Sequence, residues 1–472
     1  MNHSKNKLFI DATSLIAKNK SGVGMTLKNL LDNITKNEKF KDWDIFLIYP
    51  MGKRKQLSYY ESDKFKLLLF PLPARIIELL NRIYLLPPVD WIFGKGVYLF
   101  PNYRNWPLWK SKSITYIYDV GFLIHPETLQ PKNLSYMKKY VSKWVWRTDR
   151  IVTITNQVKY EIERLIGYPA NQISTIYCGV DSNKFYRRSR FEIKTIKARY
   201  DIKFDKYIIF VGNIEPRKNL VNLIKAFRNS KYCSENNIGL VIVGSDGWLN
   251  SSFIKIYNKS VKENYKIYKV NKYVKEEDLP AIYSGSVFSI QPAIYEGFGL
   301  TNLEAMATKT IVALSDISAM REIVKDCGFY FDPMNIDSIS NTIDSILKDN
   351  IKNINIIKER GYKRALELSW SKSASELMYL IESEKNKIHT KKPIIRIARI
   401  ILRLIDNLIR LMCRNTPLQK YVPIYFNDVD KFKKNIISDY KKERPNIFQQ
   451  NIFNTYIKTR RIIANIVRKI LK

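Results

Sequence analysis

The feature that most restricts the fold of this chain is an alternation of short apolar segments with longer amphipathic ones, which runs through two series. Short apolar runs separated by helix-length segments are typical of parallel β-strands joined by helices, because such strands are buried on both faces. The alternation therefore predicts an α/β protein with two Rossmann-like domains. The expected strands are 7–12, 45–49, 113–119, 151–155 and 173–176 in the first series and 207–211, 238–243, 266–270, 287–290 and 310–313 in the second.

The two series are separated by residues 183–206, which are polar and basic and contain no apolar run. We interpret this segment as a linker. The expected division is a first domain at 1–182, a second domain at 207–387 and an extension at 388–472. The chain of 472 residues is too long for a single ordinary core, because cores stop growing beyond about 250–300 residues.

The extension concentrates the positive charge of the chain, with 20 Lys and Arg residues against 5 Asp and Glu. The whole chain has 80 against 44, a net charge of +36. Segments 393–414 and 456–472 combine Ile and Leu with basic residues, and in the first of them the arginines fall at helical spacing. Each segment suits an amphipathic helix on an anionic membrane surface, and equally a helix docked on this protein or on a partner.

Residues 67–89 are strongly apolar and contain prolines near both ends, with Arg75, Glu78 and Arg82 inside the run. We expect an amphipathic helix here. Packing on its own domain is the ordinary role of such a helix, and a wall that touches lipid is the alternative.

The stretch 292–307, PAIYEGFGLTNLEAMA, places Glu296 and Glu304 around a Gly-Phe-Gly turn. It follows an expected strand and leads into an expected helix, which is the layout of a ligand pocket at the carboxyl edge of a parallel sheet. Gly297 and Gly299 let the backbone approach a ligand closely. An ordinary strand–helix turn with one solvated and one capping glutamate is the alternative.

A second turn of the same kind, Gly212 to Asn219, reads GNIEPRKN. Arg217 and Lys218 put two cations beside a glycine turn and the amino end of a helix, a combination that suits a diphosphate. Because the two glutamates of the other turn can bind hydroxyl groups, the pair of turns indicates a sugar nucleotide. In so basic a chain, a solvated basic turn is the alternative.

The first domain offers weaker signals. Gly22 and Gly24 form a glycine-rich turn before the first expected helix, an arrangement that favours anions. Tyr118, Asp119 and His125 lie at the carboxyl end of the third expected strand, where pockets of α/β domains form. Most single histidines are structural, so His125 is a candidate by position only.

Residues 212–219 and 295–307 together resemble the retaining family 4 glycosyltransferases, the glycosyl transferases group 1, with an E-x7-E arrangement at Glu296 and Glu304. The similarity runs from about residue 8 to 384 and includes an overall resemblance to mannosyltransferase-like members. It implies the GT-B fold, in which two Rossmann-like domains face a cleft. It also implies an EC 2.4 enzyme that moves a sugar from a nucleotide diphosphate, GDP-mannose or a UDP-sugar, to a lipid-linked glycan of a cell-surface polysaccharide such as lipopolysaccharide, with retention.

The same resemblance implies roles for individual residues. Glu296 would contact the transferred sugar, and Lys218 and Arg217 would hold the diphosphate. Glu304 would bind the ribose hydroxyls. The other donor-binding residues would be Gly22, Gly24, Gly212, Asn213, Phe298, Gly299, Leu300 and Gly244, and the acceptor and sugar side would hold Tyr118, Asp119 and His125.

Two positions depart from the family pattern. Tyr118 stands where a histidine is frequent, and Asn213 stands where an arginine is frequent. A role given to that histidine does not transfer to His125. Diphosphate binding would depend more strongly on Lys218 and Arg217.

No cofactor or metal is expected. No DxD carboxylate pair lies in a predicted pocket loop, and Asp428-Val429-Asp430 lies in the extension. The four cysteines are scattered without a CxxC pair, and the chain shows no signal peptide or bilayer-spanning run. These features predict a cytoplasmic protein, with the inner face of the cell membrane as a site of peripheral attachment.

Other classes of protein fit less well. A nucleic-acid-binding protein would explain the charge, but no recognised binding motif is present, and a Lys- and Ile-rich chain can also follow from genome base composition. We therefore expect no nucleic-acid partner. An epimerase or phosphorylase of the same fold is disfavoured by E-x7-E together with EPRKN. A non-catalytic GT-B-like scaffold and a basic protein that binds membrane or nucleic acid remain the alternatives to an enzyme.

Overall fold

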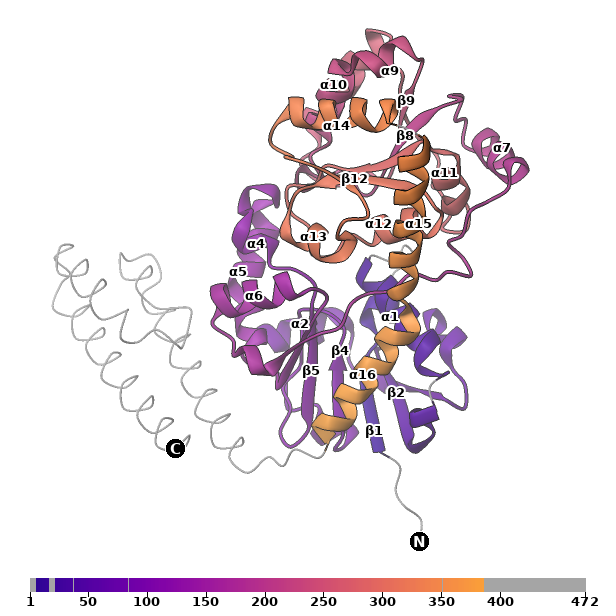
Figure 1. Ribbon diagram of the computed structural model, residues 1–472. Coiled ribbons are helices and arrows are strands. Elements are labelled where there is room, and N and C mark those ends of the chain that lie inside the picture. Colours follow the sequence, from indigo (N-terminus) through magenta and orange to yellow (C-terminus); the bar gives the residue numbers. More distant parts are fainter. Residues whose placement is uncertain (1–5, 17–21, 37, 84, 350, 386–472) are drawn as a thin grey trace, which may run out of the picture.

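The computed structural model describes residues 6–16, 22–36, 38–83, 85–349 and 351–385. They form two α/β domains stacked one on the other, each built on a parallel sheet (Figure 1). This arrangement confirms the expected pair of Rossmann-like domains. The amphipathic segments proposed at 393–414 and 456–472 lie outside the described residues.

The first domain contains a seven-stranded sheet in the order β3-β2-β1-β4-β5-β6-β7, and every pairing is parallel. Helices α1 and α16 cover one face, and α2, α5 and α6 cover the other. The elements are β1 (Asn6–Asp11), α1 (Gly22–Ile34), β2 (Trp43–Pro50), β3 (Phe65–Phe70), α2 (Ala74–Arg82), α3 (Asp90–Phe93), β4 (Val97–Phe100), β5 (Lys112–Ile117), α4 (Gly121–Ile124), α5 (Pro131–Val145), β6 (Arg150–Thr153), α6 (Asn156–Ile166) and β7 (Ile173–Thr175).

The second domain contains a six-stranded parallel sheet in the order β10-β9-β8-β11-β12-β13. Helices α8, α9, α10 and α14 cover one face, and α11, α12, α13 and α15 cover the other. The elements are α7 (Arg190–Arg199), β8 (Tyr207–Val211), α8 (Leu220–Asn229), α9 (Lys231–Glu235), β9 (Gly239–Val243), α10 (Ser251–Lys262), β10 (Ile267–Lys269), α11 (Leu279–Gly285), β11 (Phe288–Gln291), α12 (Leu300–Ala307), β12 (Ile311–Ser315), α13 (Ser318–Val324), β13 (Phe329–Phe331), α14 (Ile336–Lys348), α15 (Ile351–Glu367) and α16 (Trp370–Lys385).

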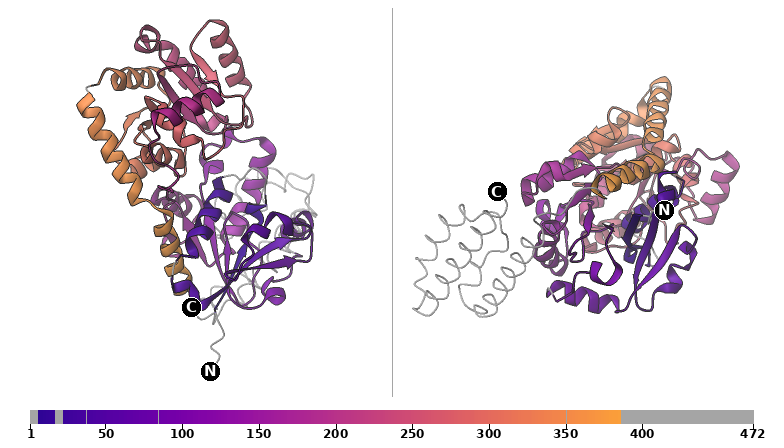
Figure 2. Two further views of the ribbon diagram at one scale, coloured as in Figure 1. Left: turned by 90° about the vertical axis from the view of Figure 1, so that its right-hand side faces the viewer. Right: turned by 90° about the horizontal axis from the view of Figure 1, so that it is seen from below.

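The last described helix, α16, returns to the first domain and packs against α1. Figure 2 shows the orange helices α15 and α16 running along one side of both domains. Two polar contacts fix α16 in place: the indole N–H of Trp43 donates to Glu382 at 3.0 Å, and Arg150 pairs with the buried Glu384 at 2.8 Å. One continuous apolar cluster runs from the first sheet through α16 into the second domain.

Three local expectations need correction. The first helix begins at Gly22, so Gly22 and Gly24 lie within α1 rather than in a turn before it. Residues 67–89 do not form one helix, because the run starts inside strand β3, and among its described residues the helix covers 74–82. The segment 183–206, interpreted as a linker, contains helix α7, which opens with a reciprocal Ser189–Glu192 capping box and packs on α11.

Candidate active site

The two glycine turns identified in the sequence meet in space. One follows β8 and the other follows β11, and these strands are neighbours in the sheet. Their loops are joined directly, since the backbone N–H of Ile294 donates to the carbonyl oxygen of Arg217 at 2.9 Å. The sequence-predicted pairing of a basic turn with an acidic turn is therefore present at the carboxyl edge of the second sheet.

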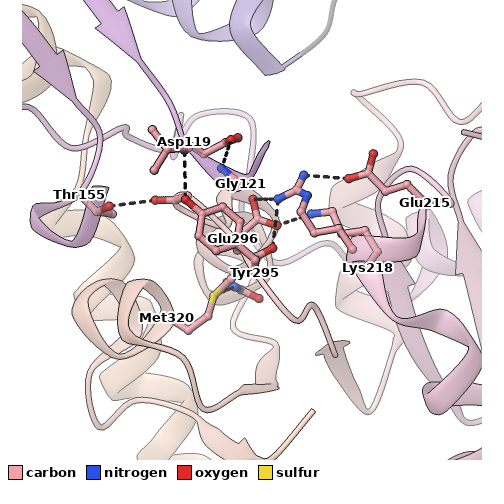
Figure 3. A network of polar contacts seen from close by, with 12 residues as sticks. Asp119, Gly121, Thr155, Glu215, Lys218, Tyr295, Glu296 and Met320 are labelled. Carbon is pink, nitrogen blue, oxygen red and sulfur yellow. Dashed lines mark hydrogen bonds and ion pairs between the residues drawn. The ribbon is translucent and has the colours of Figure 1, made fainter. Parts of the chain in front are cut away.

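Glu296 lies between two cations (Figure 3). Nζ of Lys218 donates to Oε2 of Glu296, and Nη1 of Arg217 lies 3.6 Å from Oε1. Burial alone would raise the pKa of the Glu296 carboxyl, but the charges of Lys218 and Arg217 outweigh it and lower the pKa to about 2. This carboxylate is therefore ionised near neutral pH.

Arg217 is held by the protein on two further sides. It donates to Glu215 at 2.8 Å and to the carbonyl oxygen of Tyr295 at 3.1 Å. Burial would lower the pKa of the guanidinium, but the charges of Glu296, Asp119 and Glu215 raise it. Arg217 is thus a cation held in place by several protein groups. Lys218 forms its ion pair with Glu296.

Glu304, the second acid of the motif, lies on α12 in different surroundings. The hydroxyl of Tyr283 donates to it at 3.3 Å. Burial, with the negative charge of Glu276 adding to it, raises the pKa of Glu304 to about 8. Most Glu304 side chains are therefore neutral at pH 7 in the protein without ligand.

Glycine is required where the two turns pass close to other backbone. A Cβ on Gly244, which follows β9, would lie 1.9 Å from the carbonyl oxygen of Gly212. Gly299 has φ +82° and packs against Asn302 and Met320, so a side chain there would be both strained and crowded. These glycines hold the turns at the sheet edge and leave room beside them.

A pocket of about 640 Å³ lies beside Gly212, Asn213 and Gly244, at the carboxyl ends of β8, β9 and β10. Its remaining wall includes Lys269, Asn271 to Val274 and Leu279. The sequence placed a short strand at 266–270 but gave no reason to assign the loop after it to a site. The only available signal was its position after a strand of the same sheet.

The first domain places Asp119 and His125 close to the two turns. Asp119 accepts from the backbone N–H of Gly121 at 3.0 Å, and its charge acts on Arg217. His125 is partly exposed, contacts Glu127 at 3.0 Å, and lies with its ring centre 6.0 Å from that of Tyr295. Tyr118 differs from both, because its side chain is buried in the core and its hydroxyl donates to the carbonyl oxygen of Pro101 at 3.1 Å.

Phe298 is likewise a core residue, at 3% exposure. Only its backbone can face a ligand, together with the amides of Gly299 and Leu300 at the amino end of α12. Gly22 and Gly24 lie at the start of α1, the first α-helix after strand β1.

A contact that the sequence did not reveal ties Tyr295 to the first domain (Figure 3). Its hydroxyl donates to Glu161 on α6 at 2.7 Å and accepts from the backbone N–H of Val120 at 3.2 Å. A Cβ on Gly121 would lie 3.0 Å from the Tyr295 ring, so glycine leaves space for it. Tyr295 therefore couples the position of the neighbouring Glu296 to the placement of the two domains.

The same interface is closed by two further contacts. Oγ1 of Thr155 donates to the carbonyl oxygen of Gly297 at 3.0 Å. At the amino end of α6, the backbone N–H groups of Asn156 and Gln157 donate to the Glu322 carboxylate at 2.7 and 3.0 Å. A carboxylate at a helix amino terminus is favoured by the free N–H groups and the helix dipole.

Within the described ranges, no His, Cys, Asp or Glu side chains are grouped in a way that would hold a metal ion. None of the described helices is both long and apolar enough to cross a bilayer.

Comparison with known proteins identifies the class to which this fold and cleft belong. Residues 192–364 match the sequence profile of glycosyl transferases group 1, and residues 34–184 match that of Glycosyltransferase Family 4. O-antigen chain mannosyltransferase B of Escherichia coli is 29% identical over 280 residues, which cover 59% of this chain and 72% of that protein. O-antigen chain mannosyltransferase RfbU of Salmonella typhimurium is 25% identical over 265 residues, 56% of this chain and 69% of that protein.

Solved structures share the fold. HepE of Anabaena in complex with UDP and glucose superposes with a TM-score of 0.60 at 13% identity, covering 80% of this chain and 100% of that one. Sucrose-phosphate synthase of Thermosynechococcus elongatus gives a TM-score of 0.60 at 15% identity, covering 80% and 98%. The fold is therefore GT-B. The chain belongs to the family 4 glycosyltransferases, which are retaining enzymes of class EC 2.4.

Proposed function

We propose that this glycosyltransferase moves a hexose from a nucleotide diphosphate to a lipid-linked glycan of cell-surface polysaccharide biosynthesis, with GDP-mannose as the first candidate donor and a UDP-sugar as the second. The two O-antigen mannosyltransferases among the relatives support the mannose donor and the acceptor class. The HepE structure, which has the same fold, is a complex with UDP and glucose, and this supports a UDP-sugar as the second candidate donor. The proposal places the reaction in the cytoplasm, at the inner face of the membrane.

The observation that carries the proposal is the contact of Lys218 and Arg217 with Glu296 at adjacent strand ends. A sugar diphosphate presents hydroxyls and anionic oxygens side by side, and these groups complement a carboxylate beside two cations. Glu215 holds Arg217 in place, so Lys218 is the cation that can turn from Glu296 to the diphosphate when sugar hydroxyls take its place.

Glu304, together with the pocket beside Gly212 and Gly244, would hold the nucleoside. A carboxylate accepts hydrogen bonds from two neighbouring hydroxyls, which is the pattern that a ribose offers. The pocket beside Gly212 and Gly244 is of a size suited to a base. Backbone N–H groups of Phe298, Gly299 and Leu300 would face the sugar and phosphate, and Gly22 and Gly24 would let α1 approach the phosphate from the first domain.

Retention follows from a front-side displacement, as the family resemblance implies. The bond between the anomeric carbon and the phosphate oxygen breaks, and the acceptor oxygen bonds to the same face of that carbon. The acceptor proton passes to the departing phosphate. Lys218 and Arg217 stabilise the charge that develops on the leaving group, and Asp119 and His125 would orient the acceptor.

The segments 393–414 and 456–472 remain proposed as membrane-binding helices, and they supply a basic charge suited to anionic lipid.

A panel assay tests the function. The full chain is incubated with GDP-mannose, UDP-glucose, UDP-galactose and UDP-N-acetylglucosamine, with and without lipid-linked glycan acceptors, and release of GDP or UDP is followed. We expect acceptor-dependent release from one donor, and release from GDP-mannose if the first candidate is right. Donor binding without release under any condition would favour a non-catalytic scaffold, and tight binding to oligonucleotides without donor binding would overturn the enzyme.

A further inference from the structure

Helix α2 of the first domain presents apolar side chains to solvent. Ile76, Leu79 and Ile83 recur every three or four residues, so they form one stripe along the exposed face. Leu85 follows the helix, and Trp91 and Ile92 lie in α3; all six side chains are 43–64% exposed. In the part of the chain that the structure describes, no other stretch of this length exposes more than three large apolar side chains.

The inner face of the same segment is well anchored, so the exposure is not a sign of loose packing. Ile77 is buried against the sheet, and Asn81 donates to the carbonyl oxygen of Asn105 at 3.0 Å. Asp90, at the start of α3, accepts from the backbone N–H groups of Trp109, Lys110 and Ser111 at 2.7–2.9 Å. The segment is held firmly while its outer face remains apolar.

The charge around this stripe is positive. Helix α5 carries Lys132, Lys138, Lys139 and Lys143 and contains no acidic residue. It lies beside α2, because the guanidinium of Arg82 lies 4.5 Å from the centre of the Tyr136 ring.

The acids of α2 and α3 point away from solvent or are already paired. Glu78 pairs with Arg82 and Arg104 and accepts from the hydroxyl of Tyr136, and Asp90 is taken up by backbone N–H groups. The outward surface therefore offers apolar and cationic groups together.

We propose that this surface, formed by α2, α3 and α5 and called here the α2–α5 face, docks the protein on an anionic lipid bilayer. Apolar side chains beside lysines are what an interfacial protein surface needs: the apolar groups enter the headgroup region and the lysines meet anionic lipid. The chain's own segment 388–472 is a poorer occupant, because its 20 basic and 5 acidic residues would be brought against a basic face. A second copy of the face is disfavoured by the same repulsion.

The position of the face connects it to the cleft. Arg104 reaches Glu78 of α2 at 2.8 Å, and its charge also acts on the buried carboxyl of Asp11 at the carboxyl end of β1. The bilayer would thus lie against the domain that lines the acceptor side. This consequence rests on the proposed lipid-linked acceptor, whereas docking itself does not.

Vesicle co-sedimentation of the full chain tests the proposal. The combined variant Ile76→Gln, Leu79→Gln and Ile83→Gln is compared with wild type on phosphatidylcholine vesicles with and without 30% phosphatidylglycerol, a composition of about one third anionic lipid. We expect the variant to partition onto the anionic vesicles about ten-fold or more weakly than wild type. The matched control is Ile254→Gln, Val261→Gln and Ile356→Gln, three exposed aliphatic residues of the second domain, and it should bind as wild type does.

Each remaining outcome is decisive. Equal binding by the α2 variant and wild type would overturn the proposal and assign binding to the extension. If wild type does not bind vesicles and the α2 variant, but not the control variant, melts at a lower temperature than wild type, the proposal is overturned. The α2–α5 face would then be covered by another part of the same chain. Nucleotide release without vesicles is followed in parallel, with the lipid-linked glycan acceptor supplied in detergent. Absence of release by wild type from every donor would sink the proposed function and leave docking standing. We expect the α2 variant to release nucleotide as wild type does.

Discussion

Glu296 and Glu304 belong to one motif, yet the protein gives them opposite ionisation behaviour. The pKa of Glu296 is lowered to about 2 because two cations outweigh the effect of burial, whereas the pKa of Glu304 is raised to about 8 because burial and Glu276 act together. The difference shows that the surroundings, rather than the motif, assign the chemistry. A carboxylate kept charged beside two cations suits the hydroxyls of a sugar next to a diphosphate, and a carboxyl that loses its proton when hydroxyls bind suits a ribose.

The largest effect should come from removing the cation at Glu296. We expect Lys218→Ala to lower turnover by about 10²–10³-fold, because the leaving diphosphate loses a charge-assisted contact and Glu296 loses its closest ion partner. Turnover is measured as release of nucleotide diphosphate at saturating donor. Lys225→Ala, an exposed lysine of α8, is the matched control. Wild-type turnover in Lys218→Ala would refute the assignment of this end of the cleft.

A smaller effect should come from the contact that joins Glu296 to the first domain. Tyr295→Phe removes the hydroxyl that bonds Glu161 and the Val120 N–H, so we expect kcat to fall about ten-fold while the donor KM changes little. The lost hydrogen bonds should also cost about 1–3 kcal/mol of stability, seen as a lower melting temperature.

Tyr379→Phe, on the exposed side of α16, is the control for this variant. A Tyr295→Phe enzyme that loses stability but keeps its kcat would mean that Tyr295 only holds the domains together and does not position Glu296.

The smallest effect concerns stability against pH at Glu304. Its carboxyl has an ordinary pKa of 4.5 and a folded-state pKa of about 8, so between these values the folded protein holds a proton that the unfolded chain has lost. Rising pH therefore lowers the free energy of unfolding across that window. In Glu304→Gln we expect this contribution to vanish. From pH 5 to pH 8 the melting temperature of wild type should therefore fall relative to that of the variant.

Glu235→Gln, an exposed residue of α9, should keep the wild-type pH dependence. Parallel melting curves for wild type and Glu304→Gln would contradict the raised pKa of Glu304.

The sequence predicted those features that lie within a few residues of one another. The alternating pattern predicted five strands of each sheet and missed β3, β4 and β13. The turns at 212–219 and 292–307 predicted the meeting of Arg217, Lys218 and Glu296, because parallel strands bring successive turns to one edge. The ends of the helices were predicted less well, since α1 begins at Gly22. Helix α7 lies in the segment interpreted as a linker, because its apolar residues are too few to distinguish it from a polar connection.

The remaining site features depend on residues that are distant in sequence. Tyr295 meets Glu161, which is 134 positions away, so no local pattern reports the contact. The pKa of Glu304 is raised by burial, with the charge of Glu276 adding to it and the hydrogen bond from Tyr283 opposing it, and these surroundings arise from tertiary packing around α12. Tyr118 was assigned to the acceptor side from its position after a strand, but strand residues alternate between faces and its side chain enters the core.

The most direct test of the two-carboxylate account is the proton balance of donor binding. GDP-mannose and UDP-glucose have no phosphate group that titrates near neutral pH, so any proton released on binding comes from the protein. Calorimetric titration at pH 7 in two buffers of different ionisation enthalpy measures that number. We predict proton release by wild type and by Glu296→Gln, because ribose hydroxyls favour the ionised form of Glu304, and none by Glu304→Gln. Donor binding by wild type without proton release, or with equal release in Glu304→Gln, would contradict the account.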